Sequence, residues 1–127
     1  MQINTNSEKP IFLQIAEGIE DAILSGAFSE ESQIPSITEF SVNYKINPAT
    51  ALKGINILVD NSILYKKRGL GMFVSSGAMD VLRSKRREQY FEHYIMNLVS
   101  EAKRLDLTEH EIHSMIERGF KDELYRS

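Results

Sequence analysis

The residues best suited to chemistry in this sequence lie between Gln33 and Val74. They are small polar side chains at the openings of two short helical patterns, followed by the adjacent cations Lys66, Lys67 and Arg68. Hydroxyls, amides and helix openings contact phosphate oxygens and base edges, and cations contact phosphates. The sequence has no cysteine and no Gly-x-Ser-x-Gly motif, the marks of thiol chemistry and of a nucleophile elbow. The stretch therefore indicates recognition of nucleic acid and not catalysis.

Local signals set the bounds of the first short helix. Ser36 precedes an apolar run and Glu39 follows three residues later, the capping box that satisfies two amides at a helix start. We expect this helix to end near Tyr44, with Lys45 after it. The hydroxyls of Ser36 and Thr38 are candidates for phosphate contacts, since helix openings and hydroxyls commonly make them.

The second helix is expected to run from Pro48 to about Asp60. Asn47 is suited to the N-cap and Pro48 to the first helical position, where its missing N–H costs nothing. Apolar residues at spacings of three and four predict the buried face: Ala51, Ile55, Leu58 and Val59. Helix-turn-helix proteins usually read base edges with the opening turn of this helix, on the side turned away from the buried face. The residues there are Asn47, Ala49, Thr50 and Lys53. Asn47 is a cap alone, or a cap and a DNA contact.

A small hairpin is expected after the second helix. Residues 63–65 and 72–74 have the pattern of two strands, and residues 66–71 lie between them as the turn. Gly69 and Gly71 permit a positive φ there. The cations Lys66, Lys67 and Arg68 at such a tip suit phosphates or the minor groove, although a solvated turn is the alternative. Helix, turn, helix and hairpin in this order predict a winged helix-turn-helix.

These motifs resemble the GntR family of bacterial transcription regulators. The stretches that carry the likeness are IPS (34–36), INPAT (46–50), KRGLGMFV (67–74) and, in the first helical pattern of the chain, PIFLQI (10–15). The Asn-Pro version with a short C-terminal region is similar to the YtrA-type subfamily. The match is close over about residues 8–76 and looser beyond them.

Three positions depart from the family pattern. Thr38 stands where the family commonly has Arg, Ala51 where Val is usual, and Gly54 where Ala is common. Losing the Arg removes a bidentate contact to phosphate or guanine. This departure bears on operator affinity more than on the fold.

The C-terminal part is expected to be a dimerisation region. A helical pattern runs over about residues 78–104, Leu105-Asp106-Leu107 breaks it, and Thr108 with Glu111 makes a second capping box. Two helices joined by a short turn cannot bury their apolar faces alone, so we expect them to pack on a second copy of the chain. The side chains expected in that contact are Tyr90, Tyr94, Ile95, Leu98, Val99, Ile112, Met115, Ile116 and Phe120.

The fold class expected is α+β, mainly α: a winged helix-turn-helix followed by a two-helix C-terminal dimerisation hairpin. The expected domains are residues 1–77, which would bind DNA, and residues 78–127, which would dimerise. A chain of 127 residues has room for one ordinary domain and a helical appendage. It shows no export signal and no apolar run long enough to span a bilayer, so we expect a cytoplasmic protein without membrane contact.

Charge is the feature that disagrees with DNA binding. The net charge is −3, and residues 1–77 hold six Lys and Arg against eight Asp and Glu. A basic balance is the usual footprint of a DNA-binding domain. The cations, however, belong to the helix-turn-helix and the hairpin, whereas most of the acids belong to the first helix and the loop after it. A winged-helix module for protein interaction is the alternative that the charge favours.

The histidines do not make a convincing metal site. His110 and His113 are one helical turn apart with Glu117 nearby, but no third ligand joins them, and His93 stands alone. We expect no metal and no cofactor. The leading hypothesis is a homodimeric repressor of its own operon that binds a palindromic, double-stranded operator. A small-molecule effector is compatible with the sequence, which does not identify one.

Overall fold

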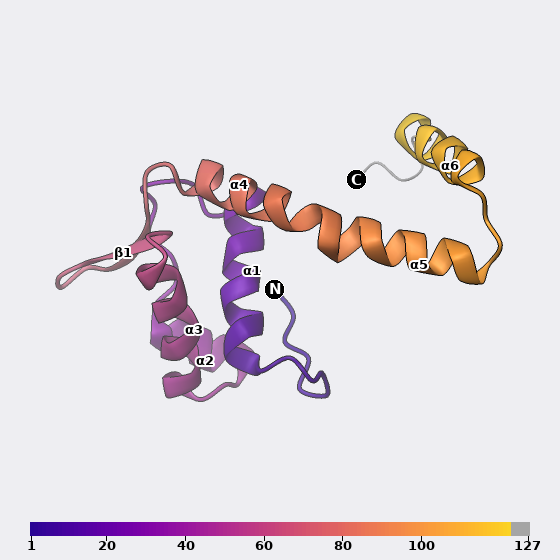
Figure 1. Cartoon of the computed structure of the whole chain (residues 1–127). Coiled ribbons are helices and arrows are strands. Elements are labelled where there is room, and N and C mark those ends of the chain that lie inside the picture. Colours follow the sequence, from indigo (N-terminus) through magenta and orange to yellow (C-terminus); the bar gives the residue numbers. More distant parts are fainter. Residues whose placement is uncertain (123–127) are drawn as a thin grey trace. The chain divides into compact units, whose positions relative to one another are not determined.

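Helices make up most of residues 1–122, the part of the chain that this computed structural model describes (Figure 1). Packing divides the chain into a first unit, Met1–Lys85, and a second unit that begins at Arg86. The elements in chain order are α1 (Ile11–Leu24), α2 (Ile37–Tyr44), α3 (Pro48–Asp60), β1 (Leu64–Lys67), β2 (Gly71–Val74), α4 (Ala78–Tyr90), the π-helical segment η1 (Phe91–Ile95), α5 (Met96–Arg104) and α6 (Glu109–Lys121). The first five elements make a winged helix-turn-helix, which confirms the expected fold class.

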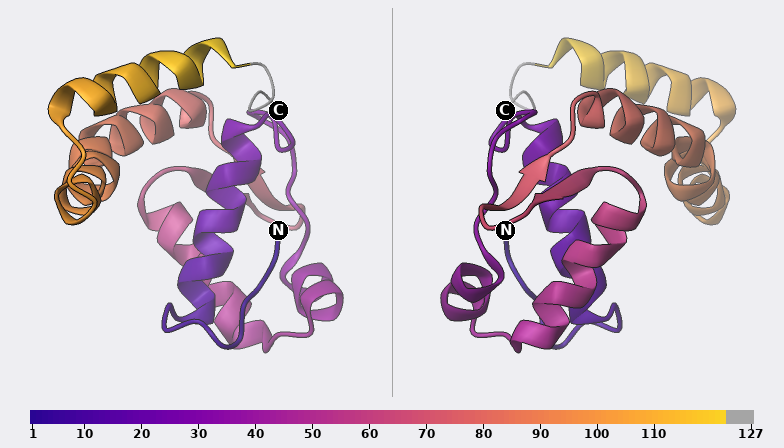
Figure 2. Two further views of the ribbon diagram at one scale, coloured as in Figure 1. Left: turned by 90° about the vertical axis from the view of Figure 1, so that its right-hand side faces the viewer. Right: turned by 90° about the vertical axis from the view of Figure 1, so that its left-hand side faces the viewer.

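The core of the first unit forms where α1 packs on α3, and both views of Figure 2 show these helices crossing. Three isoleucines of α1 are completely buried, namely Ile15, Ile19 and Ile23. The residues of α3 that face them are Ala51, Ile55 and Leu58. Val59, expected on the same face, is only half-buried. At Gly54 an added Cβ would lie 2.6 Å from the carbonyl oxygen of Phe12. The two helices therefore approach as closely as glycine allows.

The predicted capping box of α2 is confirmed. The Ser36 hydroxyl accepts a hydrogen bond from the Glu39 amide at 3.1 Å, and the Glu39 carboxylate accepts one from the Ser36 amide at 3.0 Å. Phe40 is 2% exposed and stacks on Tyr44 with 6.0 Å between ring centroids. Lys45 then turns the chain with φ of 53° and ψ of 49°, so α2 ends where the sequence predicts.

The strands of the hairpin differ from their predicted bounds: β1 begins at Leu64 and not at Ile63, and Gly71, expected in the turn, is the first residue of β2. Lys66 and Lys67 were expected in the turn, which is wrong: they are strand residues of β1 and lie opposite Met72 and Gly71. The turn is limited to residues 68–70, and the Leu70 amide donates to the Lys67 carbonyl at 2.9 Å. The pairing extends this far because Gly71 takes a φ of +118°, which an L side chain rarely adopts.

Residues 31–34 reinforce the hairpin from its other edge. The Glu31 amide donates to the Val74 carbonyl at 2.8 Å, and the Ile34 amide donates to the Met72 carbonyl at 3.0 Å. The Val74 amide in turn donates to the Ser32 carbonyl at 2.9 Å. An isolated two-stranded hairpin is marginal in water, so this third segment stabilises the wing.

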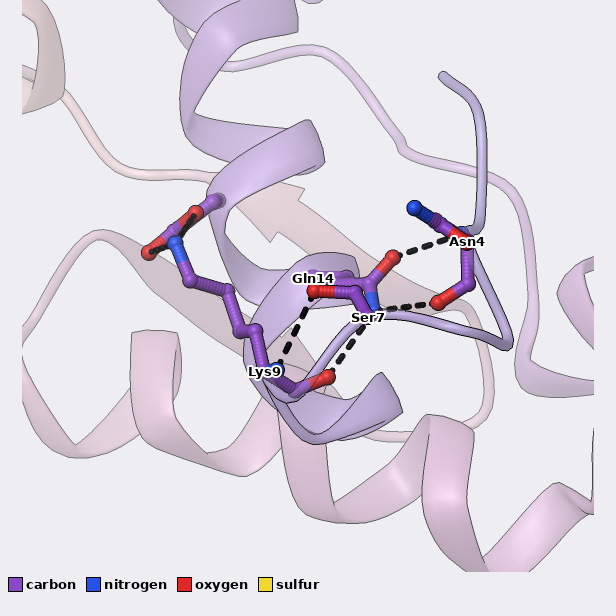
Figure 3. A network of polar contacts seen from close by, with 5 residues as sticks. Asn4, Ser7, Lys9 and Gln14 are labelled. Atoms are coloured by element: carbon purple, nitrogen blue, oxygen red, sulfur yellow. Dashed lines mark hydrogen bonds and ion pairs between the residues drawn. The ribbon is translucent and has the colours of Figure 1, made fainter.

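The N-terminal segment is fastened to α1 by one glutamine (Figure 3). The Gln14 amide group donates to the carbonyls of Asn4 and Lys9, both at 2.9 Å, and its oxygen accepts from the Asn4 amide at 2.7 Å. The Lys9 ammonium pairs with the Glu17 carboxylate at 2.8 Å. These contacts fix the chain before α1 begins.

The first turns of α4 also belong to the first unit. Ala78 and Leu82 are buried in its core. The Glu30 carboxylate accepts hydrogen bonds from the amides of Gly77 and Met79, at 2.8 and 3.0 Å. Glu20, which is 5% exposed, pairs with Lys85 at 3.1 Å. Packing therefore carries the first unit to Lys85, beyond the boundary after residue 77 that the sequence suggests.

The second unit buries little. Among residues 86–122, Ala102 alone is buried, at 7% exposure. The capping box predicted at α6 is confirmed, with both bonds between Thr108 and Glu111 at 3.1 Å. The helical pattern expected over residues 78–104 is helical throughout, with the π-helical segment η1 inside it. No helix within residues 1–122 is long and apolar enough to cross a membrane.

We expect Gly54→Ala to destabilise the fold by up to about 2 kcal/mol. Overpacking against α1 costs about 1–3 kcal/mol, and the gain in helix propensity returns about 1 kcal/mol. The control is Gly119→Ala in α6, where an added Cβ meets nothing within 4 Å, and here alanine should stabilise. Urea unfolding at a fixed protein concentration measures both. A stabilising Gly54→Ala would contradict the close approach of α1 and α3.

A second prediction concerns pH. The hydrogen bonds from Gly77 and Met79 lower the pKa of Glu30 from its ordinary value of 4.5. The stability that this carboxylate supplies is therefore complete above pH 4.5 and is lost as the pH falls through its lowered pKa. The loss of unfolding free energy from pH 7 to pH 3 should be smaller in Glu30→Gln than in the wild type. Glu88→Gln, at an exposed position of α4, should leave the wild-type difference unchanged.

Candidate nucleic-acid interface

The opening of α3 has the cap that the sequence predicts. The Asn47 side chain accepts a hydrogen bond from the Ala49 amide at 2.8 Å, and Pro48 occupies the first helical turn. Asn47, Pro48 and Ala49 are all exposed. An exposed, capped helix start presents backbone amides and a partial positive charge to solvent.

One whole side of α3 faces solvent. After Pro48, which opens the helix, the exposed positions of its first three turns are Ala49, Leu52, Lys53 and Asn56. They lie opposite the buried positions because the helix repeats every 3.6 residues. We name this stripe the outer face of α3. Thr50, also expected to read DNA, is half-buried at its edge.

Lys53 has a partner that the sequence did not indicate. Its ammonium lies 4.0 Å from the centroid of the Phe12 ring, a cation–π contact between α3 and the start of α1. The side chain is exposed but leans towards α1. No local pattern could predict this contact, because the two residues are far apart in the sequence.

The candidates of α2 lie on its exposed opening and at its end. Ser36 and Thr38 are exposed, and the Ser36 hydroxyl accepts the bond that caps the helix. Lys45 is exposed in the left-handed turn that leads to α3. The structure thus brings the candidates of both helices into one unit, Met1–Lys85.

The wing does not present its cations as a single cluster. Lys66 and Lys67 are neighbours in a strand, so their side chains point to opposite faces. The Lys67 ammonium lies 4.5 Å from the centroid of Phe73, which stacks on Tyr65 at 5.9 Å. Arg68 and Gly69 stand at the exposed tip, where Gly69 has a φ of +79°. Figure 1 shows the hairpin projecting from the body of the unit.

Gln33 is a residue of the wing that sequence reasoning missed. Its side-chain amide donates to the Leu70 carbonyl at the tip. An added Cβ on Gly71 would lie 2.8 Å from the same nitrogen. Gln33 therefore ties the tip of the wing to the segment that leads into α2, and Gly71 is required there for its φ of +118°.

Five acids of the first unit make contacts within the protein. The Tyr65 hydroxyl donates to the Glu31 carboxylate at 2.7 Å, and this hydrogen bond raises the pKa of Tyr65. Four further carboxylates take part in the ion pairs and amide contacts described above: Glu17, Glu20, Glu30 and Glu39. The formal acidity of the unit is therefore not concentrated on α3.

The apolar residues expected in a dimer contact stay accessible in the second unit. Six of them are exposed, namely Tyr90, Tyr94, Val99, Met115, Ile116 and Phe120. Three are half-buried: Ile95, Leu98 and Ile112. α5 and α6 line a groove of about 330 Å³ whose walls include Leu98, Leu105, Ile112 and Ile116. Within residues 1–122 no group of three His, Cys, Asp or Glu has metal-binding spacing, and His113 instead lies 3.6 Å from Glu109.

The chain is similar to helix-turn-helix regulators along most of its length. The uncharacterised HTH-type transcriptional regulator YhcF of Bacillus subtilis is 30% identical over 108 residues, 84% of this chain and 86% of YhcF. A GntR-family regulator from Bacteroides thetaiotaomicron has a solved structure with a TM-score of 0.70 and 34% identity, covering 87% of this chain and 96% of that one. No model of a protein family matches the sequence.

Further relatives match a shorter stretch of the chain. The DNA-binding domain of AraR, solved in complex with operator ORE1, has a TM-score of 0.52 and 30% identity over 59% of this chain and 94% of its own. The repressor NagR of B. subtilis is 32% identical over 80 residues, and this chain spans 33% of its length. The B. subtilis repressor YtrA, whose subfamily the Asn-Pro motif resembles, is also similar.

These relatives are transcription regulators and not enzymes, and the likeness to YhcF extends over both units. The winged helix-turn-helix geometry agrees with them. The chain belongs to the GntR family of helix-turn-helix transcriptional regulators.

Proposed function

We propose that this chain binds DNA sequence-specifically as a bacterial, cytoplasmic transcription regulator and represses its own operon as a homodimer on a palindromic operator. The observation that carries the proposal is the exposed outer face of α3, whose capped start and neighbouring wing belong to the same unit. The operator complex of the AraR domain supports a DNA partner.

In this mechanism α3 enters the major groove. Its opening amides and the side chains of Asn47, Ala49 and Lys53 face the duplex, as they do in helix-turn-helix proteins whose second helix reads base edges with its first turns. Thr50 lies at the margin, and Ser36, Thr38 and Lys45 approach the backbone from α2. Arg68 and Lys67, with the glycines Gly69 and Gly71, place the wing on phosphates or in the minor groove, and Lys66 approaches from the opposite strand face.

We propose that a second copy of the chain packs on the apolar face of the second unit, which we call the tail. A helical unit in which Ala102 alone is buried among residues 86–122 lacks a core of its own. Its exposed aromatic and aliphatic side chains on η1, α5 and α6 supply the missing core when two tails associate. A two-fold dimer presents two copies of α3 and so reads two half-sites about 34 Å, or a multiple of that, apart.

Repression follows from occupancy, because a dimer on the operator excludes polymerase from the promoter. A small-molecule effector would act by changing the spacing of the two copies of α3. A mobility-shift assay on the region upstream of the gene, at low and at physiological salt, tests the proposal. Absence of a shift at both salt concentrations would reject it and favour the winged-helix protein-interaction module that the charge of −3 suggests.

We expect the wing double variant Lys67→Ala with Arg68→Ala to bind all duplexes more weakly. Two lost phosphate contacts should reduce the slope of log K against log salt concentration by about 1.8. The control is Lys103→Ala with Arg104→Ala, at exposed positions of α5. Fluorescence anisotropy over a salt series measures the slope. An unchanged slope in the wing variant would reject a role for the wing.

We expect Ile116→Lys to shift the protein from dimer to monomer. Ile116 is 43% exposed on the apolar side of α6, and a charge there would have to be buried between the tails. Ser114→Lys introduces the same charge on the opposite, polar side and should leave the dimer intact. Sedimentation equilibrium of both variants decides. A dimeric Ile116→Lys would show that the contact lies elsewhere.

A further inference from the structure

The outer face of α3 carries an exposed leucine. Leu52 is 39% exposed, although the isoleucines, the valine and the other leucine of α3 are buried wholly or in part. It follows Ala49 by three positions and precedes Asn56 by four, so the three side chains form one stripe along the helix. The stripe is apolar at its start and ends in an amide.

Lys53, the charged residue next to this stripe, leans towards α1. The Lys53 ammonium lies 4.0 Å from the Phe12 ring, towards α1. Thr50 is half-buried at the edge. Lys53 is the only larger side chain on the outer face, and it makes the cation–π contact with Phe12. Leu52 is therefore the largest side chain there that makes no such contact.

The chemistry of the stripe suits A·T base pairs. Guanine is most often read by bidentate Arg or Lys; no Arg occurs from Ile37 to Asp60, and Lys53, the one Lys of α3, has its ammonium over the Phe12 ring. Thymine is distinguished in the major groove by its C5 methyl group, which apolar side chains contact, and asparagine pairs bidentately with adenine. Ala49, Leu52 and Asn56 supply these two kinds of contact and none for guanine.

We propose that Leu52 is a specificity-determining residue that packs on the C5 methyl group of a thymine in each half-site, with Asn56 one turn further along facing the adenine edge of the same A·T-containing segment. This inference rests on the proposed function, because it assumes that α3 enters the major groove. It goes further by naming the base and the atom that are recognised.

The test uses the full chain and duplexes that differ by single methyl groups. Selection from a random duplex library first gives the preferred sequence, and then each thymine is replaced in turn by deoxyuridine, which lacks only the C5 methyl group. The wild type should lose about fourfold in affinity at one thymine per half-site, the equivalent of one buried methyl group. Leu52→Ala should bind the thymine and deoxyuridine duplexes equally.

Val42→Ala is the matched control. Val42 is an exposed aliphatic residue of α2, at 70% exposure, outside the stripe, and its variant should keep the wild-type sensitivity to deoxyuridine. Circular dichroism confirms that each variant is folded. Wild-type binding that is indifferent to every deoxyuridine, or sensitivity retained in Leu52→Ala, would overturn the assignment of Leu52 while leaving DNA binding intact. Failure to enrich any sequence would overturn sequence-specific binding, and this inference with it.

Discussion

The packing of α3 on α1 is the constraint on which the rest of the first unit depends. At Gly54 the helices approach until an added Cβ would lie 2.6 Å from the Phe12 carbonyl oxygen. Because one side of α3 is buried by this approach, its opposite side is left to solvent, and the outer face is a consequence of the core. The same approach brings the Phe12 ring to the Lys53 ammonium. A single packing contact thus fixes both the orientation of α3 and the place of its cation.

The wing is positioned by backbone pairing with the chain that leads into α2. Residues 31–34 bond to β2, and Gln33 reaches the tip at Leu70. Since α2 begins directly after this segment, at Ile37, the wing and the helix-turn-helix share one hydrogen-bonded strip of backbone. Movement of the wing relative to residues 31–34 would break these bonds, so the backbone pairing holds the wing against the segment that leads into α2.

Sequence reasoning succeeded where the cause is local and failed where the cause is a distant partner. Both capping boxes and the Asn47 cap follow from residues two or three positions apart, and the structure has them as predicted. The bond from Gln33 to the tip of the wing at Leu70 could not be predicted, because the two residues are 37 positions apart in the sequence. The partners of Lys53 and Glu20 could not be predicted for the same reason, because Phe12 and Lys85 lie far away in the sequence.

The acidity of the first unit is easier to reconcile with the proposed role once the partners of its carboxylates are known. Glu30 accepts two amides at the start of α4, Glu20 faces Lys85, and Glu31 accepts the Tyr65 hydroxyl. These carboxylates stabilise the body, whereas the outer face of α3 is apolar and amide in character and holds a single cation. Net charge governs long-range attraction to a polyanion, but discrimination between bases comes from contacts at groove edges. A helix with this outer face is therefore better suited to select a sequence than to hold DNA by charge, and in the proposed mechanism the wing supplies the charge contacts.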